Sequence, residues 1–276
     1  PFLDGPRIAG LRRIAPVVLT VHDSVPFQGA ASAAQRAGWF AAMRRVDRLL
    51  VHHDVTLQTL LDRGLDAGRI GRITHGVLAG SGESHPEPGL VLLFGAMKSY
   101  KGIDVALRAL AATESPLRLL VVGPPSTDPT PWLGLSRRLG IADRVDWDPR
   151  FVPEDELDAI LGRAWAFVLP YRHADASGVL WRIAGLGRPV VASRVGGLAE
   201  ELEHEQTGLL VPPEQPAALA AALERLHGEP QLAQALGRRL ATRAARHPSW
   251  ADVARKTLAE YPLTARSHPP SGREDD

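Results

Sequence analysis

Short apolar runs alternate along the chain with longer stretches in which apolar residues recur every three or four positions. The short runs are rich in Val, Leu and Ile and indicate buried strands, whereas the longer spacing indicates amphipathic helices. Their alternation predicts an α/β protein with parallel sheets covered on both faces. Strands are expected at residues 17–21, 49–51, 70–74, 90–94, 117–122, 145–147, 166–169, 190–193 and 209–211. Helices are expected at residues 32–46, 55–63, 103–112, 131–139, 154–161, 179–186, 198–203, 217–226, 231–245 and 250–261.

A segment rich in Gly, Ser and Pro at residues 78–89 interrupts this alternation, and its composition is typical of a domain linker. The predicted strands after it suffice for a complete doubly wound domain, but those before it suffice only for the closing part of another. The sequence begins at Pro1, and no strand with a Gly-rich turn opens it, so we expect the chain to begin in mid-protein. The expected divisions are residues 1–80 for an incomplete first domain, 81–89 for the linker, 90–246 for the second domain, 247–264 for a terminal helix and 265–276 for a disordered tail.

Composition narrows the class of protein. Apolar residues make up 45% of the sequence and charged residues 23%, which are ordinary values for a globular protein. The formal net charge is only +1, whereas dedicated nucleic-acid-binding domains carry a basic excess, so no nucleic-acid partner is expected. The sequence has no cysteine, which excludes disulfides and cysteine metal sites. Arginines of the first domain indicate either contact with an anionic membrane or acidic acceptor, or a solvated helix face; they are Arg12, Arg13, Arg36, Arg44, Arg45 and Arg48.

A first candidate for anion binding is the segment FGAMKSYKG at residues 94–102, which connects a predicted strand to a predicted helix. Gly95 allows a tight turn, and Lys98 and Lys101 lie just before the helix. Ligands of open parallel sheets bind beyond the carboxyl ends of the strands. Lysines at such a turn can neutralise a phosphate together with backbone amides at the helix start. The alternative is a solvated basic loop, because exposed lysines are common.

A second candidate is the segment PYRHADASGVL at residues 170–180, which also connects a strand to a helix. Ser177 and Gly178 are expected at the helix start, where amides without an intrahelical partner face outward. Alternatively, Asp175 or Ser177 is simply the residue that caps the helix. The two interpretations are compatible, because a capped helix start can still offer amides to an anion.

Other polar residues at predicted strand ends are weaker candidates. His22 ends the first predicted strand and could hydrogen-bond a sugar, although a lone histidine is more often structural. His52 and His53 are adjacent on a strand end and should point to opposite faces, which makes them a poor metal pair. Asp146 and Asp148 flank a tryptophan in a DxD triplet. They should share a face and could bind a divalent cation, but such triplets are common by chance.

Taken together, these segments resemble glycosyltransferase family 4, the group 1 transferases with the GT-B fold. The resemblance covers about residues 16–261 and rests on the order and spacing of several strings. The family implies two Rossmann-like domains flanking a cleft, with the nucleotide-sugar donor in the second, the acceptor in the first, and a last helix that crosses back. The strings include VVLTVHD, DRLLVHHDVTLQTL, LLFGAMKSYKGIDVALRAL, FVPEDELDAILGRAWAFVLPYRHADASGVL and GLGRPVVASRVGGLAEELEHEQTGLLVPP.

The resemblance implies roles for particular residues. Lys101 matches the lysine that contacts the donor diphosphate, within the loop that begins at Gly95. Lys98 resembles a basic residue that shares this task, since Ala96 stands where many members carry an arginine. His22 matches a histidine near the donor sugar. The loop whose backbone meets the phosphates corresponds to Ser177, Gly178 and Val179.

The chain also departs from the family pattern. Many members carry two glutamates eight positions apart, the first contacting the donor sugar and the second the ribose. Ala174 and Arg182 stand at these positions here. A branch with the sequence SGV in this loop also lacks the pair. Asp175 is expected to take over the sugar contact, and Arg182 to lie in the donor site, but the base, the sugar and the acceptor stay open.

The activity implied by the resemblance is retaining transfer of a hexose from a nucleotide-sugar to a glycan, a glycolipid or a small-molecule acceptor. Neither a metal ion nor another cofactor is expected. The usual setting of the family is polysaccharide or glycolipid assembly in the cytoplasm, with peripheral contact at the inner membrane face as one form of it. Two alternatives stay open. One is an inactive truncated fragment or a non-catalytic nucleotide-sugar-binding module, and the other is a sugar-nucleotide epimerase of the same fold.

Overall fold

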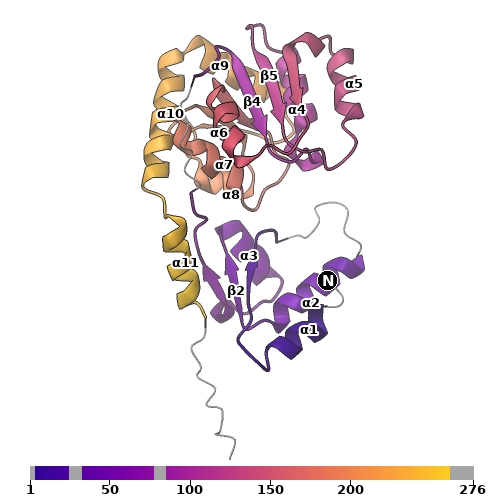
Figure 1. Cartoon of the computed structure of the whole chain (residues 1–276), viewed down its shortest axis with the longest axis vertical. Coiled ribbons are helices and arrows are strands. Elements are labelled where there is room, and N and C mark those ends of the chain that lie inside the picture. The colour runs from indigo at the N-terminus through magenta and orange to yellow at the C-terminus, as the bar shows by residue number, and fades with distance from the viewer. Residues whose placement is uncertain (1–3, 25–32, 78–84, 262–276) are drawn as a thin grey trace, which may run out of the picture.

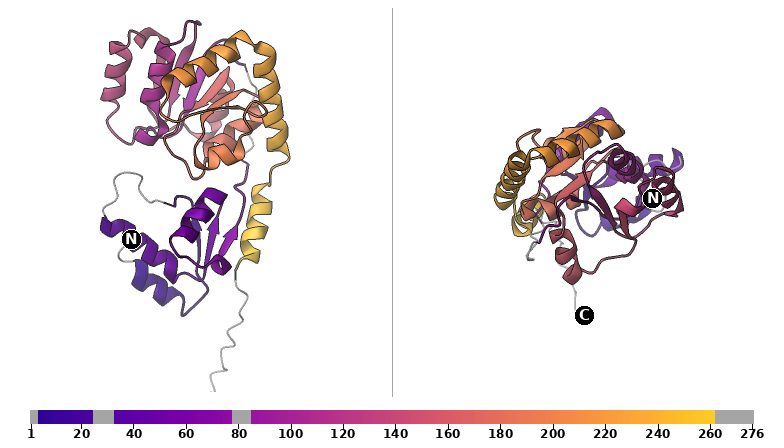
Figure 2. Two further views of the ribbon diagram at one scale, coloured as in Figure 1. Left: turned by 180° about the vertical axis from the view of Figure 1, so that it is seen from behind. Right: turned by 90° about the horizontal axis from the view of Figure 1, so that it is seen from above.

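The structure, a computed structural model, describes residues 4–24, 33–77 and 85–261. These residues form two parallel sheets with helices packed against them, and the two bodies lie one above the other in Figures 1 and 2. The predicted α/β class is therefore confirmed. The predicted linker at 81–89 lies partly outside the described residues, and the predicted tail at 265–276 lies entirely outside them.

The first sheet has three parallel strands in the order β1-β2-β3. Its strands are β1 (Val18–Val21), β2 (Arg48–Val51) and β3 (Ile70–Arg72), and its helices are α1 (Asp4–Leu11), α2 (Ala33–Arg45) and α3 (Asp54–Asp62). The central strand β2 is covered on both faces, so that Leu49, Leu50 and Val51 are at most 1% exposed. This burial explains the unbroken apolar run in its sequence.

Helix α1 is not among the elements that the sequence predicts. Its sequence, DGPRIAGL, contains two glycines and a proline, which disfavour a helix. Packing compensates for this weak propensity, because Ile8 packs against the core of the first domain together with Trp39 and Phe40 of α2. A tertiary contact of this kind leaves no trace in the local pattern.

The second sheet has six parallel strands in the order β6-β5-β4-β7-β8-β9. The direction in which successive strands are added reverses between β4 and β7. Such a reversal is the point at which open α/β sheets bind ligands, in the crevice between the loops that leave the two strands. The strands are β4 (Leu90–Phe94), β5 (Arg118–Val122), β6 (Val145–Asp148), β7 (Ala166–Leu169), β8 (Val190–Ser193) and β9 (Leu209–Val211).

Helices cover both faces of the second sheet, as the unbroken apolar strands predict. One face packs against α4 (Ile103–Ala111), α5 (Thr130–Arg138) and α9 (Pro216–Gly228). The other packs against α6 (Glu154–Gly162), α7 (Gly178–Ile183) and α8 (Gly196–Glu201). Helix α10 (Pro230–Ala245) contributes apolar side chains to both cores.

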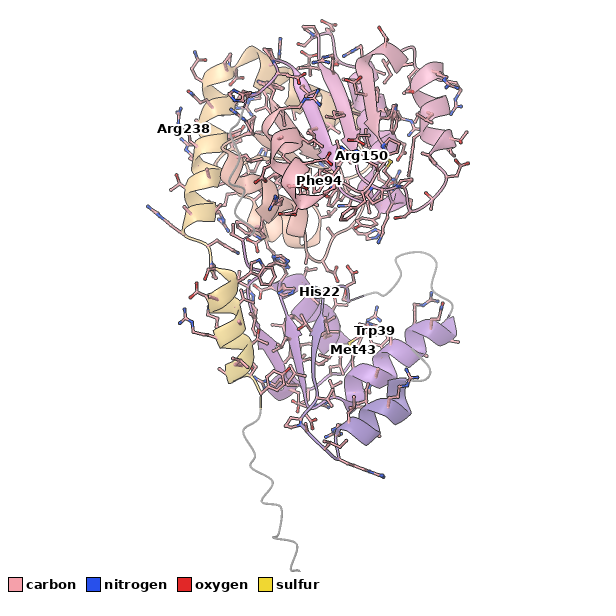
Figure 3. The ribbon with its side chains drawn as sticks, in the orientation of Figure 1. His22, Trp39, Met43, Phe94, Arg150 and Arg238 are labelled. Atoms are coloured by element: carbon pink, nitrogen blue, oxygen red, sulfur yellow. The ribbon has the colours of Figure 1, made fainter. Side chains whose placement is uncertain are left out.

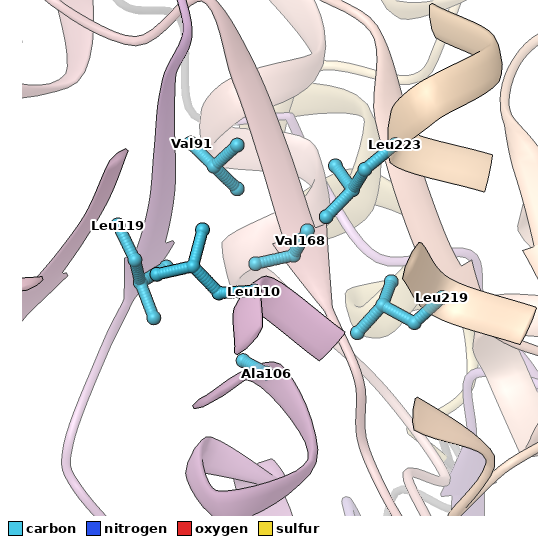
Figure 4. Close-up of a pocket in the computed structure, with 7 residues that line it drawn as sticks. All are labelled: Val91, Ala106, Leu110, Leu119, Val168, Leu219 and Leu223. Atoms are coloured by element: carbon cyan, nitrogen blue, oxygen red, sulfur yellow. The ribbon is translucent and has the colours of Figure 1, made fainter. Parts of the chain in front are cut away.

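A small cavity of about 10 Å³ lies within the first of these cores, between the sheet and helices α4 and α9 (Figure 4). This volume is about that of a single water molecule. Its lining offers no hydrogen-bond partner, so it is a packing gap and not a ligand site. The lining residues are Val91, Ala106, Leu110, Leu119, Val168, Leu219 and Leu223.

Helix α11 (Trp250–Ala259) leaves the second domain and runs along the first sheet (Figure 1). Val253 packs with Leu50 of β2 and with Ile73. Just beyond the helix, a carboxylate oxygen of Glu260 accepts a hydrogen bond from Nε of Arg48 at 2.6 Å. The chain therefore crosses from one domain to the other twice, and its last helix forms part of the first domain.

Candidate active site

The loops that follow β4 and β7 meet at the point where the strand order reverses. After β4 the chain turns at Gly95, with φ of +112°, and forms a 3-10 helix at Ser99–Lys101. A Cβ built on Gly95 would lie 3.3 Å from Nζ of Lys101 and 3.4 Å from Cγ2 of Val179 in α7. Three residues predicted for the donor site therefore surround one point at the carboxyl end of the sheet.

Gly102 allows the two loops to approach each other. Its φ is +67°, and a Cβ at this position would lie only 2.0 Å from the carbonyl oxygen of Pro170, just after β7. Any side chain would therefore collide with the backbone. The close approach brings Lys101 beside Tyr171, and Nζ of Lys101 donates a hydrogen bond to the Tyr171 hydroxyl at 2.6 Å.

Lys101 is buried, with 6% of its surface exposed. Burial, and then repulsion from Lys98, lowers the pKa of Lys101 to about 7. Its Nζ lies 4.1 Å from the centre of the Tyr171 ring and 5.6 Å from that of Tyr100. An amine in this position can hold the negative charge of a ligand that enters between the two loops.

The start of α7 is the second candidate anion site. Ser177 caps this helix, because its Oγ accepts a hydrogen bond from the backbone N–H of Leu180 at 3.3 Å. The ring of His75, from the first domain, lies 3.7 Å from the position that a Cβ of Gly178 would occupy. The first domain therefore contacts the first turn of α7 through His75.

Asp175 lies between the two domains. One of its carboxylate oxygens accepts a hydrogen bond from the backbone N–H of Ser24 at 2.5 Å. On the other side, the N–H of Gly197 in α8 donates to the carbonyl oxygen of Ala174 at 2.9 Å. This loop is thus fixed from both sides. The contact of Asp175 with a donor sugar stays a prediction.

Histidines follow all three strands of the first sheet, on the side that faces the second domain. His22 follows β1 and lies at this end in Figure 3. Its ring centre is 5.0 Å from that of His52, which in turn lies 5.4 Å from that of His75. Nδ1 of His52 donates to the carbonyl oxygen of Ile73 at 2.8 Å. Burial lowers the pKa of His52 to about 4, so this ring is uncharged at neutral pH.

His53 has different neighbours from His52, as alternation along a strand predicts. The centres of the two rings are 6.5 Å apart. Nε2 of His53 hydrogen-bonds to Oε1 of Glu201 in α8, at 3.0 Å. The two adjacent histidines therefore form different hydrogen bonds. His52 bonds within the first domain, and His53 bonds to the second domain.

The neighbouring residue of α8 caps a helix of the other domain. The carboxylate of Glu200 accepts hydrogen bonds from the backbone N–H groups of Asp54 and Val55, at 2.8 and 2.7 Å. These amides belong to the first turn of α3 and have no partner within that helix. A carboxylate at this end of a helix also interacts favourably with the helix dipole. The two domains are thus joined by directed polar contacts close to the candidate site.

Ala174 and Arg182 stand where many family members carry glutamates. Ala174 is buried, and Arg182 is 6% exposed. The guanidinium of Arg182 forms ion pairs with Glu154 and Asp158 of α6, each at 2.6 Å. Arg182 therefore joins α7 to α6. Its role in donor binding stays a prediction, and its charge already has two carboxylate partners.

The carboxylates of the DxD triplet also have partners. Asp146 lies 3.6 Å from a guanidinium nitrogen of Arg118, and Asp148 lies 2.9 Å from one of Arg150. The strand that carries them, β6, is an edge strand, two strands away from β4. Both carboxylates are therefore neutralised by arginine, away from the point where the loops meet.

Two residues of the site received no role from the sequence. Tyr171 follows β7 and binds Lys101, and Asp23 follows β1 beside His22. Burial and the charge of Asp175 raise the pKa of Asp23. Both residues lie within two positions of the end of a parallel strand, and this placement was the available signal. Their partners lie far away in the sequence, so the pattern alone could not pair them.

A comparison with known families decides the ancestry of the chain. The model of the family described as "Glycosyl transferases group 1" matches residues 88–229, just over half of the sequence. The chain belongs to this family. The match includes β4 to β9 and both loops of the candidate site. The predicted GT-B arrangement of this group 1 glycosyl transferase is confirmed by its likeness to solved structures.

A curated relative is a D-inositol 3-phosphate glycosyltransferase of Acidothermus cellulolyticus, which is 32% identical over 253 residues, or 80% of this chain. The match covers 56% of the relative, so this group 1 glycosyl transferase spans about half the length of the relative. A sucrose-phosphate synthase from Thermosynechococcus elongatus is 26% identical with a TM-score of 0.77, over 94% of this chain and 70% of the synthase. HepE of Anabaena, solved with UDP-glucose, has a TM-score of 0.79 over 92% of this chain and 75% of HepE. HepE is 17% identical to this chain, and a likeness at that level is evidence for the fold alone.

Proposed function

We propose that this group 1 glycosyl transferase moves a hexose from a nucleotide-sugar donor to a sugar, glycolipid or glycan acceptor with retention of anomeric configuration. The observation that carries the proposal is the meeting of the loops after β4 and β7 around the buried amine of Lys101. A diphosphate is the anion that this amine and the nearby first turn of α7 would suit. The name of the curated relative supports a sugar-transfer reaction, since it is a D-inositol 3-phosphate glycosyltransferase.

The proposed chemistry follows from the charges at this point. Cleavage of the bond between sugar and phosphate builds negative charge on the departing diphosphate. Lys101, Lys98 and the backbone amides near Gly178 would stabilise that charge, and preorganised donors of this kind are often the largest catalytic term. The sugar carbon acquires oxocarbenium character, as in glycoside hydrolysis. His22 would position the sugar, and the acceptor hydroxyl would attack from the face that the diphosphate leaves.

No metal ion takes part in the proposed reaction, because the two lysines supply the positive charge that a divalent cation would otherwise supply. Turnover in the presence of a chelator tests this point, and a loss restored by a divalent cation would contradict it.

The protein would act in the cytoplasm, with peripheral contact at a membrane as one setting. Support for that contact comes from Leu11 and Ile14, which are 55% and 82% exposed on either side of Arg12 and Arg13. Within the described part of the chain, no helix is long and apolar enough to cross a membrane.

A nucleotide titration tests the donor site. The melting temperature would be followed with UDP, GDP, ADP and CMP, for the wild type and for Lys101→Ala. A ligand at a hundred times its dissociation constant adds about 2.7 kcal/mol to the free energy of unfolding. We expect one nucleotide to raise the melting temperature of the wild type, and the variant to lose most of that rise. If no nucleotide binds to a cooperatively folded chain, the assignment of the donor site is wrong.

Product analysis then separates the proposed reaction from its alternatives. A retaining transferase links the sugar to an acceptor in the anomeric configuration of the donor. An epimerase converts a nucleotide-sugar without any acceptor, and a binding module or inactive fragment binds the nucleotide without turnover. Incubation of the nucleotide-sugar with and without simple sugar acceptors therefore gives a different product pattern for each.

A further inference from the structure

The buried amine of Lys101 has little around it to balance a positive charge. It donates its hydrogen bond to the Tyr171 hydroxyl, which is a neutral acceptor. The 3-10 helix that carries Lys101 also brings Tyr100 and, just before it, Lys98. Among the described residues, the charge that bears on the amine is that of Lys98, which repels it. Without a ligand, the ammonium form of Lys101 is therefore disfavoured.

Acidic groups on the surrounding elements have other partners. Asp104, in the first turn of α4, accepts hydrogen bonds from Arg172 at 3.0 and 2.9 Å and from Arg108 at 2.8 Å. Asp175, in the loop after β7, accepts from the backbone of Ser24. The charged residue of α7 is Arg182, which is paired with α6. Strand β4 is entirely apolar and adds no charge.

Lysine is rare in this sequence, and the site is where most of the lysines occur. The chain contains only three lysines, Lys98, Lys101 and Lys256, against 29 arginines. A guanidinium group stays charged at any physiological pH, whereas a buried lysine amine can release its proton. Two of the three lysines therefore occur at one site, and one of them is buried where a permanent charge would be costly.

Tyr171 fixes the position of this amine. Its side chain is 1% exposed. Its hydroxyl accepts the hydrogen bond of the Lys101 amine. The Tyr171 side chain also lies beside Ser177, the residue that caps α7. The buried tyrosine thus fixes the amine close to the loop that leads into α7.

We propose that Lys101 is a proton-coupled receptor for the diphosphate and that Tyr171 is its positioning residue. In the empty site at slightly alkaline pH the amine is mostly uncharged and is held by the Tyr171 hydroxyl. When a nucleoside diphosphate binds, the amine takes up one proton from the buffer and becomes the ammonium partner of the phosphate oxygens. This inference rests on the proposed function, because it takes a diphosphate as the ligand.

Proton uptake makes the affinity depend on pH. The complex holds one proton more than the separate partners wherever the free amine is uncharged, so the affinity falls as the pH rises. Since the pKa of Lys101 in the empty site is about 7, each pH unit above about 8 should weaken binding by up to about tenfold. This decline continues until the pH reaches the pKa of Lys101 in the complex.

The small number of lysines allows a direct test without any ligand. In protein labelled with ¹³C at the lysine Cε atoms, Lys101→Arg identifies the signal of Lys101 by its loss. We expect that signal to titrate with a midpoint near pH 7 in the empty wild type. Adding whichever of UDP, GDP or ADP binds best should raise the midpoint by at least about one unit. A midpoint above about 9.5 in the empty protein would overturn the inference and leave the proposed function intact.

Calorimetry of the same nucleotide at pH 8, in buffers of different ionisation enthalpy, counts the protons. We expect the wild type to take up close to one proton and Lys101→Met to take up none.

Tyr171→Phe keeps the ring and removes the hydroxyl, and it should weaken binding by about tenfold, the value of one hydrogen bond. Tyr261→Phe, at a residue 39% exposed beyond α11, is the matched control and should behave as the wild type.

The outcomes of the calorimetry are distinguishable. Equal proton uptake by the wild type and Lys101→Met, or wild-type affinity in Tyr171→Phe, would overturn the inference alone. A wild type that binds none of the three nucleotides would overturn the proposed function, while the midpoint of the lysine signal would still report on the empty site.

Discussion

Replacement of Lys101 by alanine is expected to lower turnover by about a hundredfold or more while the fold survives. The amine lies where the loops after β4 and β7 meet, and its proposed task is to stabilise charge on the departing diphosphate. Removal of one preorganised donor of this kind typically costs on the order of 3 kcal/mol of transition-state stabilisation. The fold should tolerate the change, because the amine binds one neutral hydroxyl and no ion-paired carboxylate among the described residues.

The matched control is Lys256→Ala, which removes a lysine side chain from the exposed face of α11. Initial rates with the nucleotide-sugar identified by titration would be compared for the two variants and the wild type. Circular dichroism and the melting temperature would report on the fold. Near-normal turnover of Lys101→Ala, or equal losses in both variants, would remove Lys101 from the mechanism.

A fall in pH from 7 to 4 is expected to destabilise the protein by about 3 kcal/mol through His52 alone. The ordinary pKa of a histidine is 6.5, whereas burial lowers the pKa of His52 in the folded protein to about 4. Between these values the unfolded chain binds the proton and the folded chain does not. The contribution of His52 to stability is therefore complete above about pH 6.5 and is lost as the pH falls towards 4. His75 and His247 add to this trend, because burial also lowers their pKa values.

Urea unfolding at pH values from 7 to 4 measures this effect. His52→Asn removes the titrating ring, while the new amide can still donate to the carbonyl oxygen of Ile73, so its stability should depend less on pH. His227→Asn is the control, since His227 is exposed and belongs to α9. Parallel pH profiles for the wild type and His52→Asn would show that this ring does not cause the acid sensitivity.

Much of the fold follows from local patterns in the sequence. The bounds predicted for β4, β7, β8 and β9 match those observed, because each is an apolar or nearly apolar run that Gly or Pro adjoins on at least one side. The loops at 95–102 and 170–178 could be singled out because each follows such a run and precedes a helix. Helix α1 was missed because packing, rather than local propensity, holds it.

The details of the site depend on contacts that no local pattern contains. Lys101 and Tyr171 are 70 positions apart in the sequence. They meet only because β4 and β7 are neighbours and because Gly102 lets the two loops approach. The ion pairs of Arg182 with α6 likewise depend on how two helices pack. The sequence could therefore indicate which loops matter, while the partners of each side chain required the three-dimensional arrangement.

The position of α11 has a consequence for the order in which the protein folds during synthesis. Leu50 and Ile73 of the first domain are covered by Val253, which the ribosome adds 203 and 180 residues later. The second domain, whose strands lie between residues 90 and 211, has its own two cores and can form before α11 emerges. The domain that is translated first is therefore the one that is completed last, and its apolar surface stays open until the chain returns to it.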